Sequence, residues 1–379
     1  MKKIVNELHS KGWLSDNLKR YMTPSLVYQG KVKANPKMHK SNMPIRTIIS
    51  GINHPTERMA EVAEKELDEW IRQLPSYIQD TTHFLREIDA IKTIIPPKCI
   101  LFAMDVKSLY PSIPKIDGLK ACKEALDNRT DKSIATIAVM KMLETVLDNN
   151  IFQFNNDNYI QVDGTAIGSK LGRNYACTCM GHWEKLLLDQ CKSKPLLYVR
   201  YVDDIFGLWT ESQEELNEFW KTANDIHHRI KVDLRSSTSK LEFLDVLVNL
   251  NCGKLDTTIF TKPSDKHMYL HSSSNHPKTT KKAIPYGLGI RARRICSTEE
   301  EFMNHKKKIL HNLVSRGYKK KETMKILNNI NKLERTTLLE YKNNDSNEAR
   351  IPLTLTFNNT LPNVQKILHN RLNVLHRSD

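Results

Sequence analysis

An apolar run that ends in an acidic residue occurs twice in this chain, and this pattern constrains the fold most strongly. Residues 99–104 form a short apolar run typical of a buried strand, and Asp105 follows at once. Residues 196–209 form two apolar arms around Asp203 and Asp204, which predicts a hairpin with both acids at its tip. Because a charge at a buried strand end is unfavourable unless it is paired or metal-bound, the three acids predict a divalent-cation site, with Mg²⁺ or Mn²⁺ favoured by oxygen ligands. An Asp-Asp pair alone is also a common turn, so the surrounding sequence must decide.

Strands and helices alternate around these acids. Helical spacing predicts helices over three stretches: 53–74, 133–147 and 171–190. A further helix begins at a capping box, Ser212 to Glu215. Alternation predicts a hairpin and two strands: 151–162, 230–234 and 241–250. This order predicts an α+β domain of the split βαβ type, with an antiparallel sheet and helices on one face, and the chain beyond Thr261 is expected to be helical and basic.

The positive charge of the chain is concentrated in its last third. The 379 residues carry a net charge of +15, with a pI near 9.3. Residues 1–260 contain 35 basic and 33 acidic side chains, whereas residues 261–379 contain 23 and 10. Such segregation predicts a phosphate-binding element, and nucleic acid is the simplest polyanionic partner.

Composition excludes several other classes. The hydrophobic fraction is 39%, and no stretch approaches the roughly 18 consecutive apolar residues of a membrane-spanning helix. No apolar segment of a signal peptide follows the charged N-terminus. The seven Cys are odd in number and irregularly spaced, which indicates a reducing compartment. We therefore expect an intracellular protein, nuclear or cytoplasmic, that is neither secreted nor anchored in a membrane.

Two motifs contain these acids in a specific form. Asp105-Val-Lys-Ser-Leu-Tyr110 and Tyr201-Val-Asp-Asp204 resemble motifs A and C of reverse transcriptases. Further runs resemble reverse transcriptases of Penelope-like retroelements, which are related to telomerase: Ala34–Lys40, Ile45–Gly51, Lys262–Ser272, Asn275–Pro277, Ile290–Cys296 and Ser315–Tyr318. The resemblance covers almost the whole chain. It implies a right-hand polymerase with fingers (1–98), a palm (99–255) and a basic helical thumb with a C-terminal extension (256–379).

The resemblance also implies an activity, RNA-directed DNA synthesis by two-metal nucleotidyl transfer. Asp105 and Asp203 would be the principal ligands of two Mg²⁺ or Mn²⁺ ions, with Asp204 beside them and a backbone carbonyl from Val106. Because neighbouring side chains of a strand point to opposite faces, we do not expect Asp203 and Asp204 to contribute equally. The partners would be an RNA template, a DNA primer, their hybrid duplex and dNTPs.

Four residues are implied in dNTP binding. Lys37 and Arg46 would hold the triphosphate, and Tyr110 would lie beneath the incoming sugar and reject a 2′-hydroxyl. Gly168, in the small-residue run 164–169 that resembles the start of motif B, would let the backbone approach the base pair. The alternatives are surface charges for Lys37 and Arg46 and an ordinary buried ring for Tyr110.

Other candidates lie towards the C-terminus. Lys240 is either a general acid for the departing pyrophosphate or a surface lysine at a turn. Basic thumb residues would follow the duplex backbone, or else form a solvated face: Arg291, Arg293, Arg294, Lys306, Lys307 and Lys308. Two sets have zinc-ligand residue types without Cys-x-x-Cys spacing, so we expect core thiols and polar thumb residues there: Cys177, Cys179 and His182, and His267, His271 and His276.

The chain departs from the family pattern in motif B. Arg173 replaces a Pro and Cys177 replaces an Asn, which leads us to expect weakened catalysis even though the acids are intact. The rival interpretation is therefore a catalytically impaired or host-adopted protein that only binds nucleic acid. A two-metal nuclease is disfavoured because the fingers residues and Tyr110 would have no role in it.

The GIY-YIG endonuclease that follows many of these reverse transcriptases does not occur before Asp379, so we do not expect target cleavage. A fragment, a type that lacks the endonuclease and extends existing 3′ ends, and a degraded or host-adopted copy remain open.

Overall fold

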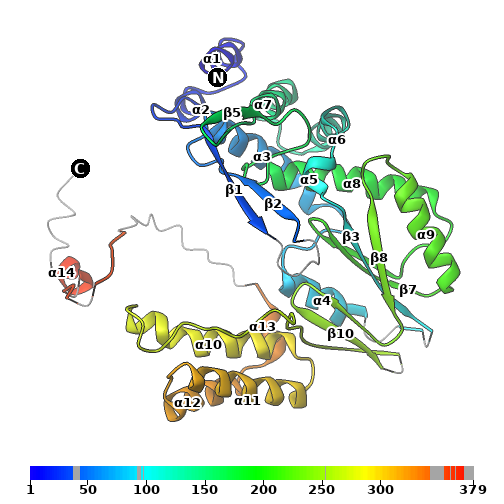
Figure 1. Ribbon diagram of the computed structural model, residues 1–379. Coiled ribbons are helices and arrows are strands. Elements are labelled where there is room, and N and C mark those ends of the chain that lie inside the picture. The colour runs from blue at the N-terminus through cyan, green and yellow to red at the C-terminus, as the bar shows by residue number, and fades with distance from the viewer. Residues whose placement is uncertain are drawn as a thin grey trace. The chain divides into compact units, whose positions relative to one another are not determined.

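The structure is a computed structural model in which residues 1–36, 43–91, 95–96, 98–251, 253–341, 354–358, 360–362 and 364–370 are described (Figure 1). Two compact units divide the chain, Met1–Leu255 and Asp256–Asp379. Each unit has a hydrophobic core of its own.

The first unit mixes helices with strands. Its helices are α1 (Lys2–Ser10), α2 (Asp16–Met22), α3 (Glu57–Arg72), α4 (Thr81–Ile91), α5 (Leu109–Ser112), α6 (Lys115–Asn128), α7 (Thr136–Asp148), α8 (Gly172–Gln190) and α9 (Gln213–Asp225). Its strands are β1 (Gly30–Pro36), β2 (Ile45–Ile49), β3 (Ile100–Val106), β4 (Ile151–Phe154), β5 (Asp157–Ile160), β6 (Leu197–Tyr201), β7 (Asp204–Trp209), β8 (Val232–Ser237), β9 (Lys240–Phe243) and β10 (Val246–Asn251). The next strand, β11 (Lys254–Ile259), spans the boundary between the units.

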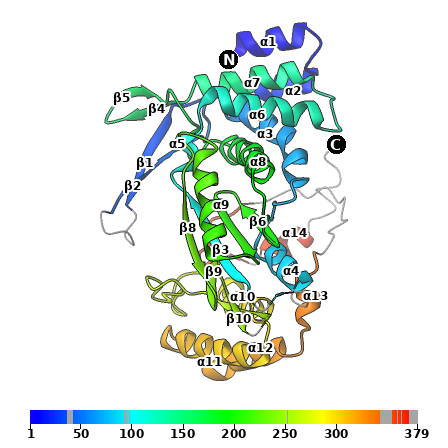
Figure 2. The same cartoon turned by 90° about the vertical axis from the view of Figure 1, so that its right-hand side faces the viewer.

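The central sheet has the strand order β6-β7-β3-β8, and all neighbouring strands are antiparallel (Figure 2). Because helices separate β3 from the β6–β7 hairpin, and α9 separates β7 from β8, this is the predicted split βαβ arrangement, and the α+β fold class is confirmed. On one face, the Phe219 ring of α9 packs against Phe102 and Trp209, with ring centroids 6.1 and 5.3 Å away.

The other face of the central sheet is covered as well, which the sequence did not indicate. The Phe84 ring of α4 lies 5.2 Å from Phe206 of β7 and 4.7 Å from Phe243 of β9. The sheet therefore lies between two layers, and its strands are apolar on both faces, as strands covered on both sides must be.

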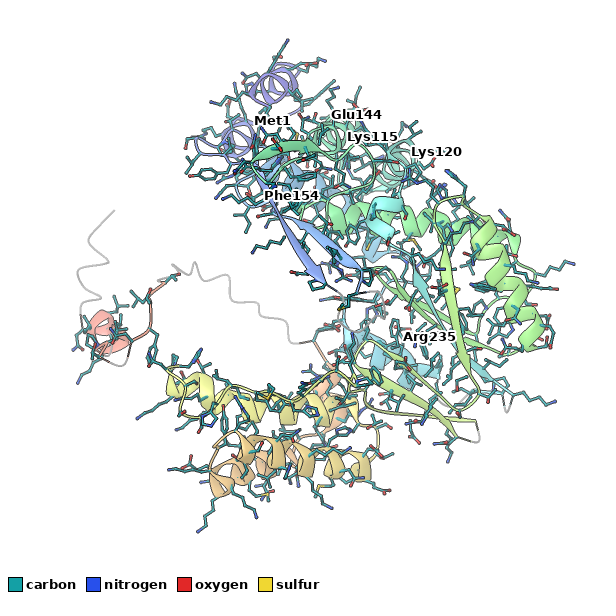
Figure 3. All side chains as sticks on the ribbon, viewed as in Figure 1. Met1, Lys115, Lys120, Glu144, Phe154 and Arg235 are labelled. Carbon is teal, nitrogen blue, oxygen red and sulfur yellow. The ribbon has the colours of Figure 1, made fainter. Side chains whose placement is uncertain are left out.

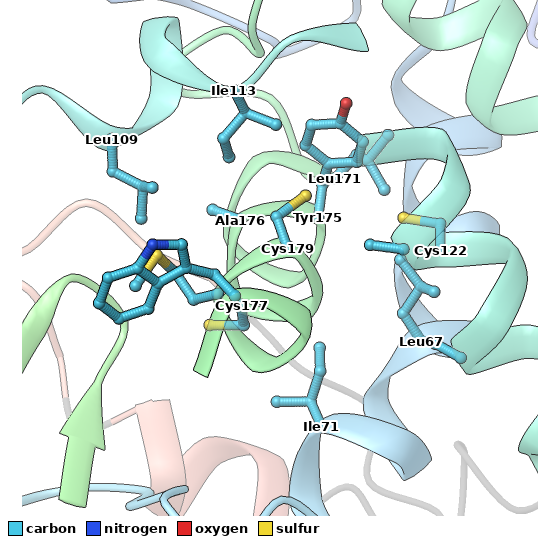
Figure 4. Close-up of a cluster of buried hydrophobic side chains, with 14 of the residues drawn as sticks. Leu67, Ile71, Leu109, Ile113, Cys122, Leu171, Tyr175, Ala176, Cys177 and Cys179 are labelled. Atoms are coloured by element: carbon cyan, nitrogen blue, oxygen red, sulfur yellow. The ribbon is translucent and has the colours of Figure 1, made fainter. Parts of the chain in front are cut away.

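The core beside α8 is built from small and apolar side chains of α3, α6 and α8 (Figure 4). Two glycines allow close approach: a Cβ on Gly118 of α6 would collide with the Tyr175 ring, and a Cβ on Gly181 would lie 2.8 Å from the Trp70 ring and from a methyl of Leu74. Cys122 and Tyr175 are fully buried here, at 0% exposure. This packing fixes α8, the helix that follows the motif B loop.

Two predicted β segments contain tight turns. Residues 151–162 form the predicted hairpin β4–β5, whose two-residue turn has positive φ at Asn155 (+55°) and Asn156 (+70°), the signature of a type I′ turn. The segment 241–250 is two strands rather than the single strand predicted. Its turn begins at Leu244 with φ +54°. The buried positions change from odd to even numbers across this turn, but Leu244 and Leu247 are apolar as well, so the apolar run shows no break in the sequence.

Two smaller sheets complete the strands. The N-terminal sheet has the order β2-β1-β4-β5, and the third sheet has the order β11-β10-β9.

The second unit is mainly helical, as predicted for the chain beyond Thr261. Its helices are α10 (Lys278–Ile295), α11 (Glu299–Ser315), α12 (Lys320–Ile330), α13 (Arg335–Leu339) and α14 (Val364–His369). Phe302, Leu313 and Ile330 form part of its core. Among the helices of the described ranges, none has the length and apolar character needed to cross a membrane.

Candidate polymerase site

The strand register brings acidic residues into one row across the central sheet. Asp105 of β3 lies directly opposite Asp204 of β7 on one side and Asp233 of β8 on the other. Residues directly opposite in antiparallel strands project from the same face, so these three carboxylates share a face. Asp105 and Asp233 are both exposed, with side chains 55% and 59% accessible. The sequence singled out Asp105 and Asp204 but missed Asp233.

Asp203 lies in the tight turn beside this row. Tyr201 pairs with Asp204, so Val202 and Asp203 form a two-residue hairpin loop. Val202 has φ +58°, and a loop with positive φ at its first residue alone is of type II′, a position normally taken by Gly. A β-branched residue in this conformation is strained. The Asp203 carbonyl accepts a hydrogen bond from the Val106 amide at 3.4 Å, which places the turn over the end of β3.

Burial and nearby negative charges both act on Asp204. Burial raises the pKa of Asp204 from 3.8 to about 6, and the nearby Asp203 and Asp105 charges and a hydrogen bond with Asp105 act in the same direction. The Arg235 guanidinium opposes this rise. Arg235 lies on β8, labelled in Figure 3, with its Nε 3.9 Å from Asp105 Oδ2. The ionised form of Asp204 is therefore disfavoured unless a cation binds beside these carboxylates.

Burial of the acids differs from the sequence prediction in one respect. Asp105 is exposed, because it is the one outward-facing residue near the end of a strand that is otherwise buried. The desolvation argument for a metal site therefore holds for Asp204 but not for Asp105. The register places Asp204 rather than Asp203 opposite Asp105, and the ranking of Asp203 as a principal ligand stays a prediction.

The oxygen donors in the row have the right chemistry for a hard cation, but they are not grouped as a complete metal site. Carboxylates of Asp105 and Asp204, together with the Val106 carbonyl, are the oxygen ligands that Mg²⁺ and Mn²⁺ prefer. Within the described part of the chain, however, no three His, Cys, Asp or Glu side chains are grouped so that they could hold a metal ion. The chemistry of the donor set fits a divalent cation, and the metal prediction remains a proposal.

Tyr110 is packed between the motif B loop and α8. A Cβ on Gly172, the first residue of α8, would lie 3.3 Å from Cε1 of Tyr110. The Tyr110 carbonyl accepts from the Thr165 amide at 3.0 Å, and Gly164 (φ +70°) leaves room for that carbonyl. Burial raises the pKa of Tyr110 to about 12, and Cys177 and Asp203 are among the neighbours that add to the rise. The ring therefore lies near the acids, in a fixed position.

Gly168 joins the motif B loop to the N-terminal sheet. Its φ is +113°, and a Cβ there would collide with the Ile49 carbonyl at the end of β2. The Ile49 amide donates to the Ile167 carbonyl at 2.8 Å. Arg46 is exposed on the same strand, opposite Asn35. Lys37, its predicted partner, lies outside the described residues.

The two motif B departures lie on the first turns of α8. Arg173 is exposed, whereas Cys177 is 2% exposed and belongs to the core cluster of Figure 4. Burial raises the pKa of the Cys177 thiol. Position 177 therefore acts on the site from the interior, through its neighbours.

One buried ion pair behind the acids was missed. Arg200 of β6 and Glu184 of α8 are 2% and 5% exposed, and Arg200 Nε lies 2.6 Å from Glu184 Oε1. A charged residue within an otherwise apolar strand was the available signal in the sequence, but its partner, 16 residues earlier on a helix, could not be identified by spacing.

Lys240 is not brought to the acids. It is exposed at the start of β9, and its amide bonds to Ser237 Oγ at 3.1 Å. Ser237 is paired with Leu101, four residues before Asp105 on β3, which is roughly 13 Å along a strand. The general-acid prediction finds no support in this position.

The predicted duplex-binding residues separate into two groups. Lys306 is buried at 7% exposure and donates to Asn331 Oδ1, so the prediction of a surface contact is wrong for it. Arg293 bonds to the Leu333 carbonyl and Arg294 to the Leu338 carbonyl, which holds the chain around α13. The exposed members are Arg291, Lys307 and Lys308.

The residues with zinc-ligand types have other neighbours in the described structure. Cys177 and Cys179 are core thiols, as expected, and His182 Nδ1 lies 2.9 Å from Glu124 Oε2. His267 and His271 interact with Tyr269 and Ser273 in the second unit.

Comparison with known proteins agrees with this geometry at the level of the fold. A family model described as an animal helix-turn-helix domain matches residues 268–328. No curated protein sequence matches the chain. Among solved structures, telomerase from Candida albicans in complex with the TWJ fragment of telomeric RNA has a TM-score of 0.58 and 11% identity, over 86% of this chain and 59% of that one.

Two further structures are similar. Apo telomerase from Candida tropicalis gives a TM-score of 0.51 at 13% identity, over 86% of this chain and 65% of that one. The RNA-dependent RNA polymerase of BmCPV at the elongation state gives 0.50 at 10% identity, over 82% and 28%. This chain spans 56–65% of the length of three telomerase chains that it matches. The fold is thus a right-hand polymerase fold of the reverse-transcriptase type.

Proposed function

We propose that this protein is an RNA-directed DNA polymerase of a Penelope-like retroelement, which extends a primer 3′ end by nucleotidyl transfer. The register that sets Asp105 opposite Asp204, with Asp203 in the adjoining turn, is the observation that carries this proposal. The polymerase fold supports the general class. The motif resemblance supplies the RNA template and the Penelope-like origin.

The acids would hold two Mg²⁺ or Mn²⁺ ions. Asp105, Asp203 and Asp204, with the Val106 carbonyl, would be the ligands, and such ions would supply charge stabilisation for the attacking and leaving oxygens of an in-line transfer. The raised pKa of Asp204 supports this assignment, because burial and the neighbouring carboxylates both disfavour its charged form until a cation neutralises it.

The substrate would be oriented by residues around the acids. Tyr110, held against Gly172, would close the space beneath the sugar, and Gly168 would let the base pair approach the loop. Arg46, with Lys37, would bind the triphosphate as fixed positive charges. The exposed basic residues of the second unit, Lys307 among them, would contact the backbone of the template–primer hybrid. Such substrates would place the protein in the nucleus or cytoplasm.

Primer extension tests the proposal. The full chain is supplied with an RNA template, an annealed DNA primer, dNTPs and Mg²⁺ or Mn²⁺, beside the double variant Asp203→Ala with Asp204→Ala. We expect extension by the parent and none by the variant. Extension by both would assign the product to a contaminating polymerase, and extension by neither would refute the activity.

A second candidate function is nucleic-acid binding without catalysis. The helix-turn-helix match over residues 268–328 and the motif B departures favour it. Reverting Arg173→Pro and Cys177→Asn separates the two functions. Pro is tolerated in the first turn of a helix, and Arg173 is the second residue of α8, so the reversion is compatible with the backbone. A large gain in extension would show that the parent is impaired, and no gain would show that the changes are tolerated.

A further inference from the structure

A buried guanidinium lies directly behind the catalytic turn. Arg200 precedes Asp203 by three residues, and its Nη1 donates to the carbonyl of Val202 at 2.9 Å. Its other nitrogens face Glu184, with Nε 2.6 Å from Oε1 and Nη2 3.1 Å from Oε2. This two-pronged geometry uses the planar fork of arginine, which lysine cannot reproduce.

The bond to Val202 acts on a strained peptide. Val202 has φ +58°, which a β-branched residue adopts only when its surroundings enforce it. The carbonyl that Arg200 binds belongs to the peptide that joins Val202 to Asp203. A hydrogen bond at this carbonyl therefore fixes the orientation of the peptide that carries Asp203.

The Arg200–Glu184 pair is itself held by further hydrogen bonds. Ser76, in the segment between α3 and α4, donates through Oγ to Glu184 Oε2 at 2.7 Å. The Ser76 carbonyl accepts from the Arg200 amide at 2.6 Å. On α8, the Cys177 carbonyl accepts from Arg200 Nη2 at 3.4 Å. The motif B helix, the Ser76 segment and the catalytic hairpin thus meet at this buried ion pair.

We propose that Arg200, held by Glu184, is a positioning residue that keeps Val202 in its strained conformation and so places Asp203 for nucleotidyl transfer. This inference rests on the proposed polymerase function. It assigns Arg200 no contact with the substrate, so its loss affects the chemical step rather than dNTP binding.

The test replaces the pair and then relieves the strain. Removing one partner alone would leave a buried charge, so Arg200→Met is combined with Glu184→Leu, since apolar residues of similar size often replace buried pairs without loss of stability. We expect kcat for single-nucleotide incorporation to fall at least tenfold, with KM for dNTP within about twofold. Adding Val202→Gly should restore most of the lost rate, because Gly adopts positive φ without strain.

A second variant, Arg200→Lys, tests the same role if the double variant does not fold. Arg200→Lys keeps the positive charge beside Glu184 but lacks the fork that reaches Val202. The same loss of kcat and the same recovery with Val202→Gly are expected.

A matched control uses another buried pair of the first unit. Arg129 and Glu66 are 1% and 17% exposed, with Nη2 3.4 Å from Oε2, and Arg129 also donates to the Ile134 carbonyl, away from the turn. Arg129→Met with Glu66→Leu should leave kcat of the folded protein within about twofold, and Val202→Gly should give no recovery in that background.

The outcomes separate this inference from the proposed function. Parental kcat in folded Arg200 variants, or a loss that Val202→Gly does not recover, would overturn the positioning role. If the parent itself does not extend primers, the proposed function fails. In that case, hydrogen exchange of peptides spanning residues 197–209 tests the positioning role of Arg200. Faster exchange in the Arg200 variants, slowed again by Val202→Gly, would support this role, and unchanged exchange would overturn it.

Discussion

Replacing Asp204 by Asn should stabilise the protein while it removes a proposed metal ligand. The raised pKa means that folded Asp204 keeps its proton up to about pH 6, whereas in the unfolded chain the proton is lost near 3.8. Between these values the native state binds more protons, so the free energy of unfolding falls as pH rises and stays lowered above pH 6. The amide of the Asp204→Asn variant does not titrate, so the variant avoids this fall.

The magnitude follows from the size of the shift. A change from 3.8 to about 6 is about two pKa units, or ~3 kcal/mol at 1.36 kcal/mol per unit. Because Asp204 is only partly buried, solvent screening reduces this, and we expect ~2 kcal/mol at pH 7. Near pH 3.5, where the carboxyl is mostly protonated in both states, the parent and the variant should differ in stability by less than ~0.5 kcal/mol.

The assay is urea unfolding followed by tryptophan fluorescence, in EDTA, from pH 3.5 to 8. All five Trp lie within residues 1–220, so the signal reports the first unit. Asp233→Asn is the control, because Asp233 is exposed in the same row, 2.7 Å from Lys107 Nζ, and its loss should change stability by less than ~1 kcal/mol. An Asp204→Asn variant that is no more stable than the parent at pH 7, or whose gain is independent of pH, would refute the reasoning.

Other variants test separate parts of the structure. Tyr110→Ala should raise incorporation of ribonucleotides relative to dNTPs roughly tenfold in a competition assay, if the ring closes the sugar site; an unchanged ratio would argue against a gate. Gly289→Ala would place a Cβ against the Ile330 side chain of α12 and should destabilise the second unit by about 1–3 kcal/mol. Gly287→Ala, with nothing within 4 Å, should stabilise it by up to about 1 kcal/mol in thermal melts. Lys307→Gln should reduce the slope of log affinity against log salt by about one for a hybrid duplex, while Lys306→Met leaves it unchanged; equal slopes would show that neither lysine contacts phosphate.

Local patterns in the sequence predicted the elements that hold the acids. Apolar runs interrupted by acids predicted β3 and the β6–β7 hairpin, and the capping box at Ser212, with Glu215 bonded in return, begins α9 as predicted. These features depend on neighbours within a few residues. The order of the elements then sufficed for the split βαβ sheet, because few chain paths join such elements without crossing.

Features that depend on distant contacts were beyond the sequence. The partner of Arg200 lies on another element, and Asp233 becomes notable only once β8 pairs with β3. Burial of Lys306 depends on how α11 packs, and its place within a lysine run suggested the opposite. The turn at Leu244 was also hidden, because apolar residues on both faces of the segment conceal the change of buried positions from odd to even numbers.

The most direct measurement is single-nucleotide incorporation on an RNA template by the parent, by Asp105→Asn and by Asp233→Asn. The two acids belong to the same row of the sheet, but only Asp105 lies opposite Asp204. A catalytic carboxylate pair predicts that Asp105→Asn lowers the rate by about 10³-fold or more, whereas Asp233→Asn stays within a few-fold of the parent. An Asp105→Asn variant that incorporates dNTP at the parental rate would contradict the account.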